Sequence, residues 1–211
     1  MAHALRPYEA GVLCVVLGTR VKTGRAELFP MRQLLKRHSD SHYFSAANVE
    51  VEVSRPTANR LVLHYIVTGN MSDVNIAPLG PPARADKLWQ HTCFEAFVRP
   101  TSGSEYYEFN FAPSTQWAAY RFGRYRSGMS VATDISAPSI EVESKPDCLR
   151  LRTSLELDQL SDLTRNALWR LGLSVLIEDL SGRKSYWALA HTPGKPDFHH
   201  VDAFAYEFSP P

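Results

Sequence analysis

Carboxylate, amide and aromatic side chains gather in two neighbouring segments of the sequence, Trp89–Phe97 and Tyr106–Phe111. Successive side chains of a strand point to opposite faces, so two strands here would each have one apolar and one polar face. The polar faces would carry these side chains: His91, Cys93, Glu95, Tyr106, Glu108 and Asn110. Polar groups held beside aromatic rings on rigid strands suit a small polar ligand such as a sugar. The alternative is that this face is simply the solvated outer surface of a sandwich.

A third strand over Gln116–Phe122 would extend the polar face. We expect one row of charged and amide groups to cross the three strands: Glu95, Glu108, Asn110 and Arg121. Opposite charges in such a row would hold one another and present fixed donors and acceptors to a ligand. A surface ion-pair ladder that contributes little is the alternative. Glu95 and Glu108 could also act as the acid and base of a glycosidase, although hydrogen bonding to hydroxyls fits them equally well.

A second polar cluster lies in Pro196–His200, near a further histidine at position 191. Consecutive residues of an extended chain point opposite ways, so His199 and His200 cannot easily bind one metal together. A transition metal would need His91 or His191 to join one of them. A partly buried, hydrogen-bonded histidine is the simpler interpretation. The sequence also lacks a Gly-x-Ser-x-Gly elbow, a Cys-x-x-Cys pair and a phosphate-binding loop, which leaves nucleophilic catalysis without support.

The overall composition indicates one ordinary globular domain. The chain has 211 residues, 44% of them hydrophobic and 21% charged, with a formal net charge of +1. No run of Lys and Arg exists that could follow a phosphate backbone, so we expect no nucleic-acid partner. The longest apolar run, Gly11–Gly18, is too short to span a bilayer and makes a poor signal peptide. We therefore expect a cytoplasmic protein without a membrane partner.

The apolar pattern predicts an all-β fold, an antiparallel β-sandwich with one short helix. Alternation begins at residue 49, so we divide the chain into an N-terminal strand with an irregular extension, 1–48, and a sandwich domain, 49–211. Helical spacing favours Asp158–Trp169, and a short helix could also form over Pro30–Arg37. The predicted strands are Val49–Arg55, Arg60–Thr68, Trp89–Phe97, Tyr106–Phe111, Gln116–Phe122, Ile140–Lys145, Cys148–Leu155, Leu173–Glu178, Ser185–Ala190 and Val201–Phe208.

Four motifs resemble those of uncharacterised bacterial DOMON-like proteins, which are related to family 9 carbohydrate-binding modules. They are Leu88–Phe97, Gln116–Tyr120, Ser185–His191 and Pro196–His200, and the resemblance covers about residues 49–208. It implies a β-sandwich that serves as a non-catalytic binding module for a sugar or for haem. In the sugar-binding members a Trp and a Glu of a Trp-x-x-Asp-x-x-Glu motif contact the ligand.

Residue by residue, the resemblance assigns the tryptophan and glutamate to Trp89 and Glu95, a polar contact to Asn110, and a second aromatic wall to Phe198. Thr92 stands where the motif has an aspartate, and Phe198 where it has a tryptophan. The complete predicted ligand site is Trp89, His91, Glu95, Asn110, Arg121, Phe198 and His199.

Three alternatives stay open. Haem would need axial ligands from a methionine and a histidine, and the candidates are Met71, Met129, His64, His91 and His199. Calcium could use carboxylates that form no recognised loop: Asp86, Asp134 and Asp202. Residues 10–48 could instead make the protein an interaction module.

Overall fold

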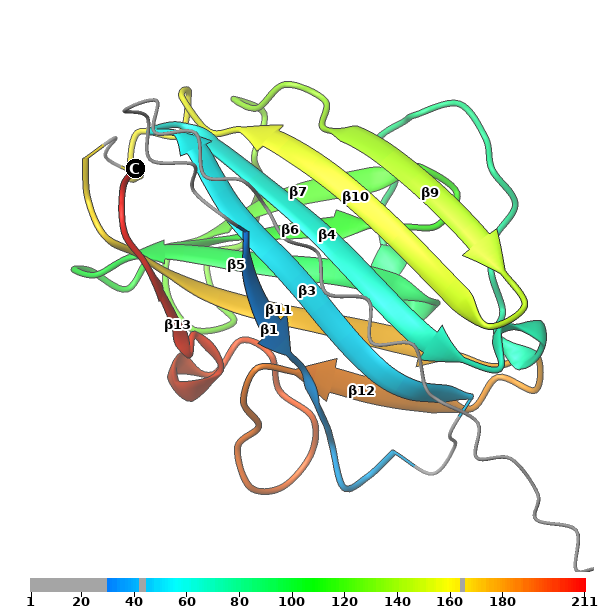
Figure 1. The fold of residues 1–211 in the computed structure, drawn as a ribbon. Helices are drawn as coiled ribbons and strands as arrows, with labels where there is room; N and C mark the ends of the chain where they lie inside the picture. The colour runs from blue at the N-terminus through cyan, green and yellow to red at the C-terminus, as the bar shows by residue number, and fades with distance from the viewer. Residues whose placement is uncertain (1–29, 42–44, 164–165) are drawn as a thin grey trace, which may run out of the picture.

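Two antiparallel sheets pack face to face in the computed structural model, which describes residues 30–41, 45–163 and 166–211 (Figure 1). The smaller sheet has the order β1 (Met31–Leu34), β3 (Ala46–Thr57), β4 (Arg60–Gly69), β10 (Cys148–Glu156) and β9 (Ser139–Lys145). The larger sheet has the order β2 (Lys36–Arg37), β12 (Lys184–Ala188), β11 (Trp169–Glu178), β5 (Cys93–Pro100), β6 (Tyr106–Phe111), β7 (Trp117–Phe122) and β8 (Ser130–Val131), and β13 (Tyr206–Phe208) also pairs with β11. The predicted all-β sandwich is therefore confirmed.

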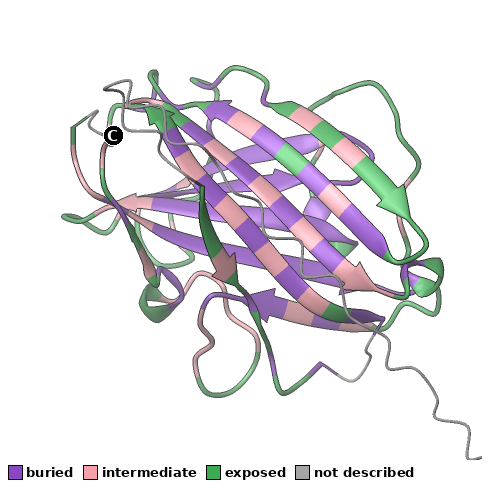
Figure 2. Cartoon of the chain, in the orientation of Figure 1, coloured by how far each residue is buried: buried purple, intermediate pink, exposed green. Residues whose placement is uncertain are grey.

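Alternation along the strands of the smaller sheet explains which side of it is buried. On β3, Val49, Val51 and Val53 are buried while the residues between them are partly exposed. Figure 2 shows the same stripes along β3 and β4. Because side chains alternate across a strand, one face of this sheet packs on the core and the other meets water.

The middle of the larger sheet is buried on both of its faces, and this positions the site. Inward side chains such as Phe94 and Phe109 join the main core between the sheets. Outward side chains such as Phe97 and Tyr120 form a second apolar cluster with Phe204. The segments before β5 and after β12 cover this outer face, so polar groups among these side chains are held away from water.

Arg55 on β3 is a buried cation in the core. Its guanidinium lies 3.3 Å from the ring centroid of Trp169 and donates to the carbonyl oxygens of Ala58 and Ala167. Burial lowers the pKa of Arg55 to about 10. Stacking on an aromatic ring and bonding to carbonyls suits a guanidinium, so we attribute a structural role to this side chain.

The helix predictions are wrong. Residues 31–34 and 36–37 form β1 and β2, because each finds a strand partner, in β3 and β12 respectively. The described residues between 158 and 168 form turns, and β11 begins at Trp169. In the described ranges the helical elements are three single 3-10 turns: η1 (Met71–Asp73), η2 (Leu88–Gln90) and η3 (Val201–Ala203).

Residues 1–29 lie outside the described part of the chain, so the predicted role of the 10–48 segment stays a prediction there. In the described ranges, no helix is long and apolar enough to cross a membrane.

Candidate ligand-binding site

A cavity of about 510 Å³ opens on the outer face of the larger sheet. Strand side chains from β5 and β6 contribute to its lining, together with the segment before β5, the loop after β7 and the loop after β12. A volume of this size is typical of small-molecule sites. Its aromatic and charged lining residues include Trp89, Glu95, Glu108, Arg126, Lys184, Tyr186, Phe198 and His199.

The strand register places the predicted polar groups together. Glu95 on β5 lies directly opposite Asn110 on β6, and Phe97 lies opposite Glu108. Side chains directly opposite on an antiparallel pair share one face of the sheet. The predicted polar face of these two strands is therefore confirmed, and it faces the cavity rather than open water.

The prediction that Arg121 completes this row is wrong. Arg121 shares a face with Trp117 and Ala119, as its parity requires, but both of those side chains pack into the core between the sheets. Arg121 therefore lies on the opposite side of the sheet from the cavity. There its Nε donates to Asp162 Oδ2 at 2.7 Å, and the Tyr107 hydroxyl donates to the same oxygen.

Glu95 is a buried carboxyl group at the floor of the cavity, with only 3% of its surface exposed. The Ser174 hydroxyl donates to Glu95 Oε2 at 2.9 Å, and the Tyr65 hydroxyl reaches across the core to the Glu95 backbone carbonyl at 2.7 Å. Burial, together with the nearby charge of Glu108, raises the pKa of Glu95 to about 8. This carboxyl group therefore holds a proton at neutral pH.

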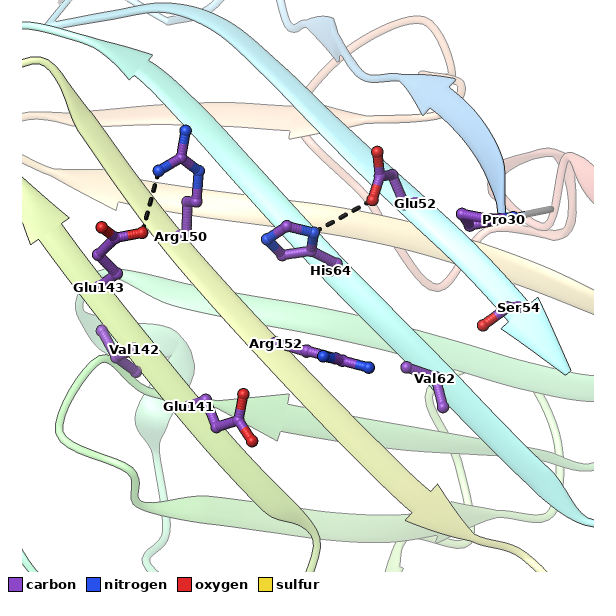
Figure 3. Close-up of a pocket in the computed structure, with 10 residues that line it drawn as sticks. All are labelled: Pro30, Glu52, Ser54, Val62, His64, Glu141, Val142, Glu143, Arg150 and Arg152. Carbon is purple, nitrogen blue, oxygen red and sulfur yellow. Dashed lines mark hydrogen bonds and ion pairs between the residues drawn. The ribbon is translucent and has the colours of Figure 1, made fainter. Parts of the chain in front are cut away.

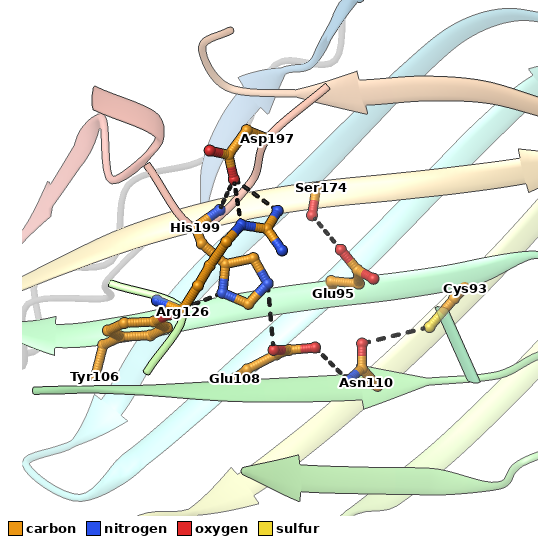
Figure 4. A network of polar contacts seen from close by, with 9 residues as sticks. All are labelled: Cys93, Glu95, Tyr106, Glu108, Asn110, Arg126, Ser174, Asp197 and His199. Carbon is orange, nitrogen blue, oxygen red and sulfur yellow. Dashed lines mark hydrogen bonds and ion pairs between the residues drawn. The ribbon is translucent and has the colours of Figure 1, made fainter. Parts of the chain in front are cut away.

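Behind the floor, Asn110 fixes the second carboxyl group (Figure 4). Asn110 Nδ2 donates to Glu108 Oε1 at 2.8 Å, and the Cys93 thiol donates to Asn110 Oδ1 at 3.6 Å. Burial raises the pKa of Glu108 as well, although the bond from Asn110 opposes that shift. Asn110 is fully buried, so it orients Glu108 from behind while Glu108 lines the cavity.

His199 closes one side of the cavity as a neutral imidazole. The Tyr106 hydroxyl oxygen accepts from the backbone N–H of Arg126 and lies 2.8 Å from His199 Nδ1. We therefore assign the Tyr106 O–H as the donor to Nδ1, which leaves the ring hydrogen on Nε2, 3.7 Å from Glu108 Oε2. Burial and the charge of Arg126 lower the pKa of His199 to about 4.

An ion pair ties together the two loops that flank the cavity. Arg126 Nη2 donates to Asp197 Oδ1 at 2.8 Å, and Arg126 Nε donates to the same oxygen at 3.2 Å. That oxygen also accepts the backbone N–H of His199, and the Tyr125 hydroxyl donates to Asp197 Oδ2. Figure 4 shows the contacts of Asp197 with Arg126 and His199, beside Glu95 and Glu108. The position of His199 thus depends on contacts with the loop after β7.

Aromatic rings form the sides of the cavity. Trp89, in η2, packs edge-on against Tyr120 with ring centroids 5.7 Å apart. Phe198, in the loop after β12, lies beside Tyr186 with ring centroids 6.4 Å apart. Both Trp89 and Phe198 are partly buried and line the cavity. The arrangement offers apolar ring surfaces around polar, fixed hydrogen-bonding groups.

The predicted site residues divide into three groups. Trp89, Glu95, Phe198 and His199 line the cavity, and Asn110 supports it from behind. The third group, His91 and Arg121, lies away from the cavity.

His91, by contrast, does not line the cavity: its side chain is 67% exposed and its Nδ1 lies 2.7 Å from Glu178 Oε2. The neighbouring Thr92 serves the fold, because its hydroxyl donates to the Asn75 carbonyl and accepts from the Glu178 backbone N–H.

The lining residues that the predicted site did not include are led by three polar ones on other elements, Arg126, Lys184 and Tyr186, and by Glu108, which the sequence placed on the polar face only. Arg126 lies in an irregular loop and has a positive φ of 48°, so no periodicity reveals where its side chain points. Lys184 and Tyr186 alternate along β12, and only the pairing of β12 with β11 brings their face to the cavity. The sequence signal for Tyr186 was its place inside one of the four recognised motifs, Ser185–His191.

The cofactor candidates are scattered in the structure. Met129 and His199 line the same cavity, but both ring nitrogens of His199 face protein partners, which conflicts with an axial haem ligand. Met71 is buried in the core. Of the proposed calcium ligands, Asp86 accepts from the Tyr120 hydroxyl. Within the described ranges no three His, Cys, Asp or Glu side chains group closely enough to hold a metal.

A second hollow, of about 610 Å³, lies on the solvated face of the smaller sheet (Figure 3). Four of its titratable groups are paired with one another: His64 Nδ1 lies 3.1 Å from Glu52 Oε2, and Arg150 Nη1 donates to Glu143 Oε2 at 3.0 Å. Among the described residues, its lining contains no Trp, Tyr or Phe. We therefore take the cavity on the larger sheet as the candidate site.

Comparisons with known proteins agree with the fold. No family model matches the sequence, and no curated protein is significantly similar to it. Among solved structures, a "putative carbohydrate-binding protein" from Bacteroides uniformis matches with a TM-score of 0.60 and 16% identity, over 82% of this chain and 83% of that one.

A family 9 carbohydrate-binding module from Caldicellulosiruptor kristjanssonii matches in two complexes. The complex with cellotriose has a TM-score of 0.50 and 14% identity, over 84% of this chain and 83% of that one. The complex with glucose has a TM-score of 0.51 and 13% identity, over 91% of each chain. At these identities the likeness shows a shared β-sandwich fold.

Proposed function

We propose that this protein binds a saccharide, without catalysis, in the cavity on the larger sheet. The observation that carries the proposal is the combination of aromatic sides, Trp89 and Phe198, with a floor of fixed polar groups. Pyranose rings have apolar C–H faces and a rim of hydroxyl groups. Aromatic rings match the faces, and carboxyl, hydroxyl and imidazole groups match the rim.

Each floor residue has a role that follows from its contacts. Glu95 holds a proton at neutral pH, so it can donate to a sugar oxygen through its free side while Ser174 donates to Oε2. Neutral His199 presents its Nε2 hydrogen toward Glu108 and the cavity. Because these groups are held by further hydrogen bonds, they need little reorganisation when a ligand binds.

The structural neighbours support the same class of ligand, since two of the solved complexes contain cellotriose and glucose. The two positions at which the sequence departs from the family motif, Thr92 and Phe198, have identifiable roles in the structure. Thr92, which replaces the motif aspartate, ties the segment before β5 to β11 through Asn75 and Glu178. Phe198 replaces a tryptophan but still lines the cavity.

The test is calorimetric titration of the purified protein with monosaccharides and disaccharides, after a thermal-shift screen. A ligand that binds only the folded state raises the melting temperature with the logarithm of its concentration above Kd. We expect Trp89→Ala to weaken saccharide binding at least tenfold. The matched control is Arg152→Ala in the second hollow, which should leave binding unchanged. Equal effects of the two substitutions would refute this location, and a Soret shift on haem addition would redirect the proposal to haem.

A further inference from the structure

We infer that the cavity selects saccharides that carry a primary ammonium group, the hexosamines, over the corresponding neutral hexoses. This inference rests on the proposed saccharide function and specifies its ligand. It starts from Glu95 and Glu108, here called the acid pair, which line one cavity from neighbouring strands.

The acid pair lacks a basic partner. Glu95 is bonded by the Ser174 hydroxyl at Oε2 only, and its other oxygen is left to the cavity. Glu108 accepts from Asn110, and the neutral ring of His199 is 3.7 Å away. In the described ranges, neither carboxyl group forms an ion pair with a lysine or an arginine. A buried carboxylate is normally paired, since isolated burial of its charge is strongly unfavourable.

The nearest guanidinium is engaged elsewhere. Arg126 donates twice to Asp197, so it contributes a positive potential to the acid pair but no hydrogen bond. Lys184 also lines the cavity, and the charges of Lys184 and Arg126 would oppose a cationic ligand. The titratable and charged groups around the acid pair are Tyr65, Cys93, Tyr106, Tyr120, Arg126, Lys184, Tyr186, Asp197 and His199.

An ammonium group supplies what the acid pair lacks. It has three donors and a positive charge, and it would replace the proton that the empty site holds. Hydrogen bonds between charged groups are about twice as strong as those between neutral ones. The amino sugar should therefore bind more tightly than the hexose that has a hydroxyl group at the same position. Trp89, at the side of the same cavity, provides an aromatic ring that also favours a cation.

The experiment compares closely matched ligands by calorimetry at pH 6.5 on the full chain. Glucosamine, galactosamine and mannosamine are each set against the parent hexose, with N-acetylglucosamine as the uncharged control and glucuronate as the anionic one. We expect at least one hexosamine to bind tenfold or more tightly than its parent and N-acetylation to remove that advantage. Binding should also release close to one proton, measured in two buffers with different ionisation enthalpies.

Other outcomes separate the inference from the function on which it rests. Neutral hexoses that bind as tightly as the hexosamines would overturn the inference and leave saccharide binding intact. Preference for glucuronate would also overturn it and would assign selection to the cations of the lining, Lys184 and Arg126. Failure of every sugar to bind would refute the proposed function itself.

A substitution locates the selectivity. Glu95→Gln keeps the shape of the side chain and an acceptor for Ser174, so it should fold, as far-ultraviolet circular dichroism will check. We expect it to bring the hexosamine-to-hexose ratio of affinities close to one. Glu108→Gln serves as the second variant if the first does not fold. A ratio that stays tenfold or more in the folded variant would exclude the acid pair as its source.

Discussion

The strongest test of the electrostatic description is the pH dependence of stability in Glu95→Gln. In the folded protein the pKa of Glu95 is about 8, against an ordinary value of 4.5. Between these two values the folded state binds this proton more tightly than the unfolded chain does. The free energy of unfolding should therefore be largest below pH 4.5 and should fall as pH rises toward 8.

The size of the effect follows from proton linkage. One proton changes the free energy of unfolding by at most about 1.4 kcal/mol per pH unit, so the full window gives an upper limit of about 5 kcal/mol. Glu108 shares the environment and retains a raised pKa in the variant, so we expect about 2–4 kcal/mol. Relative to Glu95→Gln, the wild-type protein should lose this amount between pH 5 and pH 8.5.

The contribution of His199 to the pH dependence of stability has the opposite sign, so it must be separated from that of Glu95. Its pKa in the folded state is about 4, below the ordinary 6.5, so its contribution makes the protein more stable as pH rises through that window. Both proteins retain His199, and the difference between their curves removes its contribution. Urea unfolding at half-unit pH steps measures that difference. Parallel curves across the whole range would refute the claim that Glu95 is protonated in the folded protein.

The remaining predictions concern the supports of the site and of the fold. Arg126→Ala should weaken saccharide binding about tenfold while lowering the free energy of unfolding by less than about 1 kcal/mol, since its ion pair is exposed; titration and urea unfolding compare the two. Arg55→Met should cost about 2–4 kcal/mol, because the carbonyls of Ala58 and Ala167 lose their donor; an unchanged urea midpoint would contradict this. Gly69→Ala should cost more than about 2 kcal/mol, because φ is 147° and a Cβ would overlap the Ser45 carbonyl; thermal unfolding checks it.

Strand periodicity made the sandwich predictable. Alternation over β3, β4 and β10 was visible in the sequence because one face of each strand meets the core and the other meets water. The Asp158–Trp169 segment misled for a physical reason: Leu160 and Leu163 are buried at helix-like spacing, but they lie in turns that close the end of the sandwich. Spacing of apolar residues alone does not distinguish these two arrangements.

The site was predictable only where it lies on strands. Parity placed Glu95 and Asn110 correctly, since both are fixed by the pleat of β5 and β6. For Arg121, the sequence correctly indicated that it shares a face with Trp117, but it did not indicate which side of the sheet that face is on. That depended on where Trp117 packs, and Trp117 packs into the core. Arg126 lies in a loop without periodicity, so its place at the cavity follows from tertiary contacts, the ion pair with Asp197 and the bond from its backbone N–H to Tyr106.

The cavity is built partly from strand residues and partly from loop residues, and this division bears on how its specificity could change. Floor residues alternate along β5 and β6 with core residues such as Phe94 and Phe109, so inserting or deleting a residue there would disturb the whole sandwich. Phe198 and His199 lie in a loop that is joined to the rest of the site through Asp197. New specificities should therefore arise by exchange of residues 191–200, while the acidic floor is inherited unchanged.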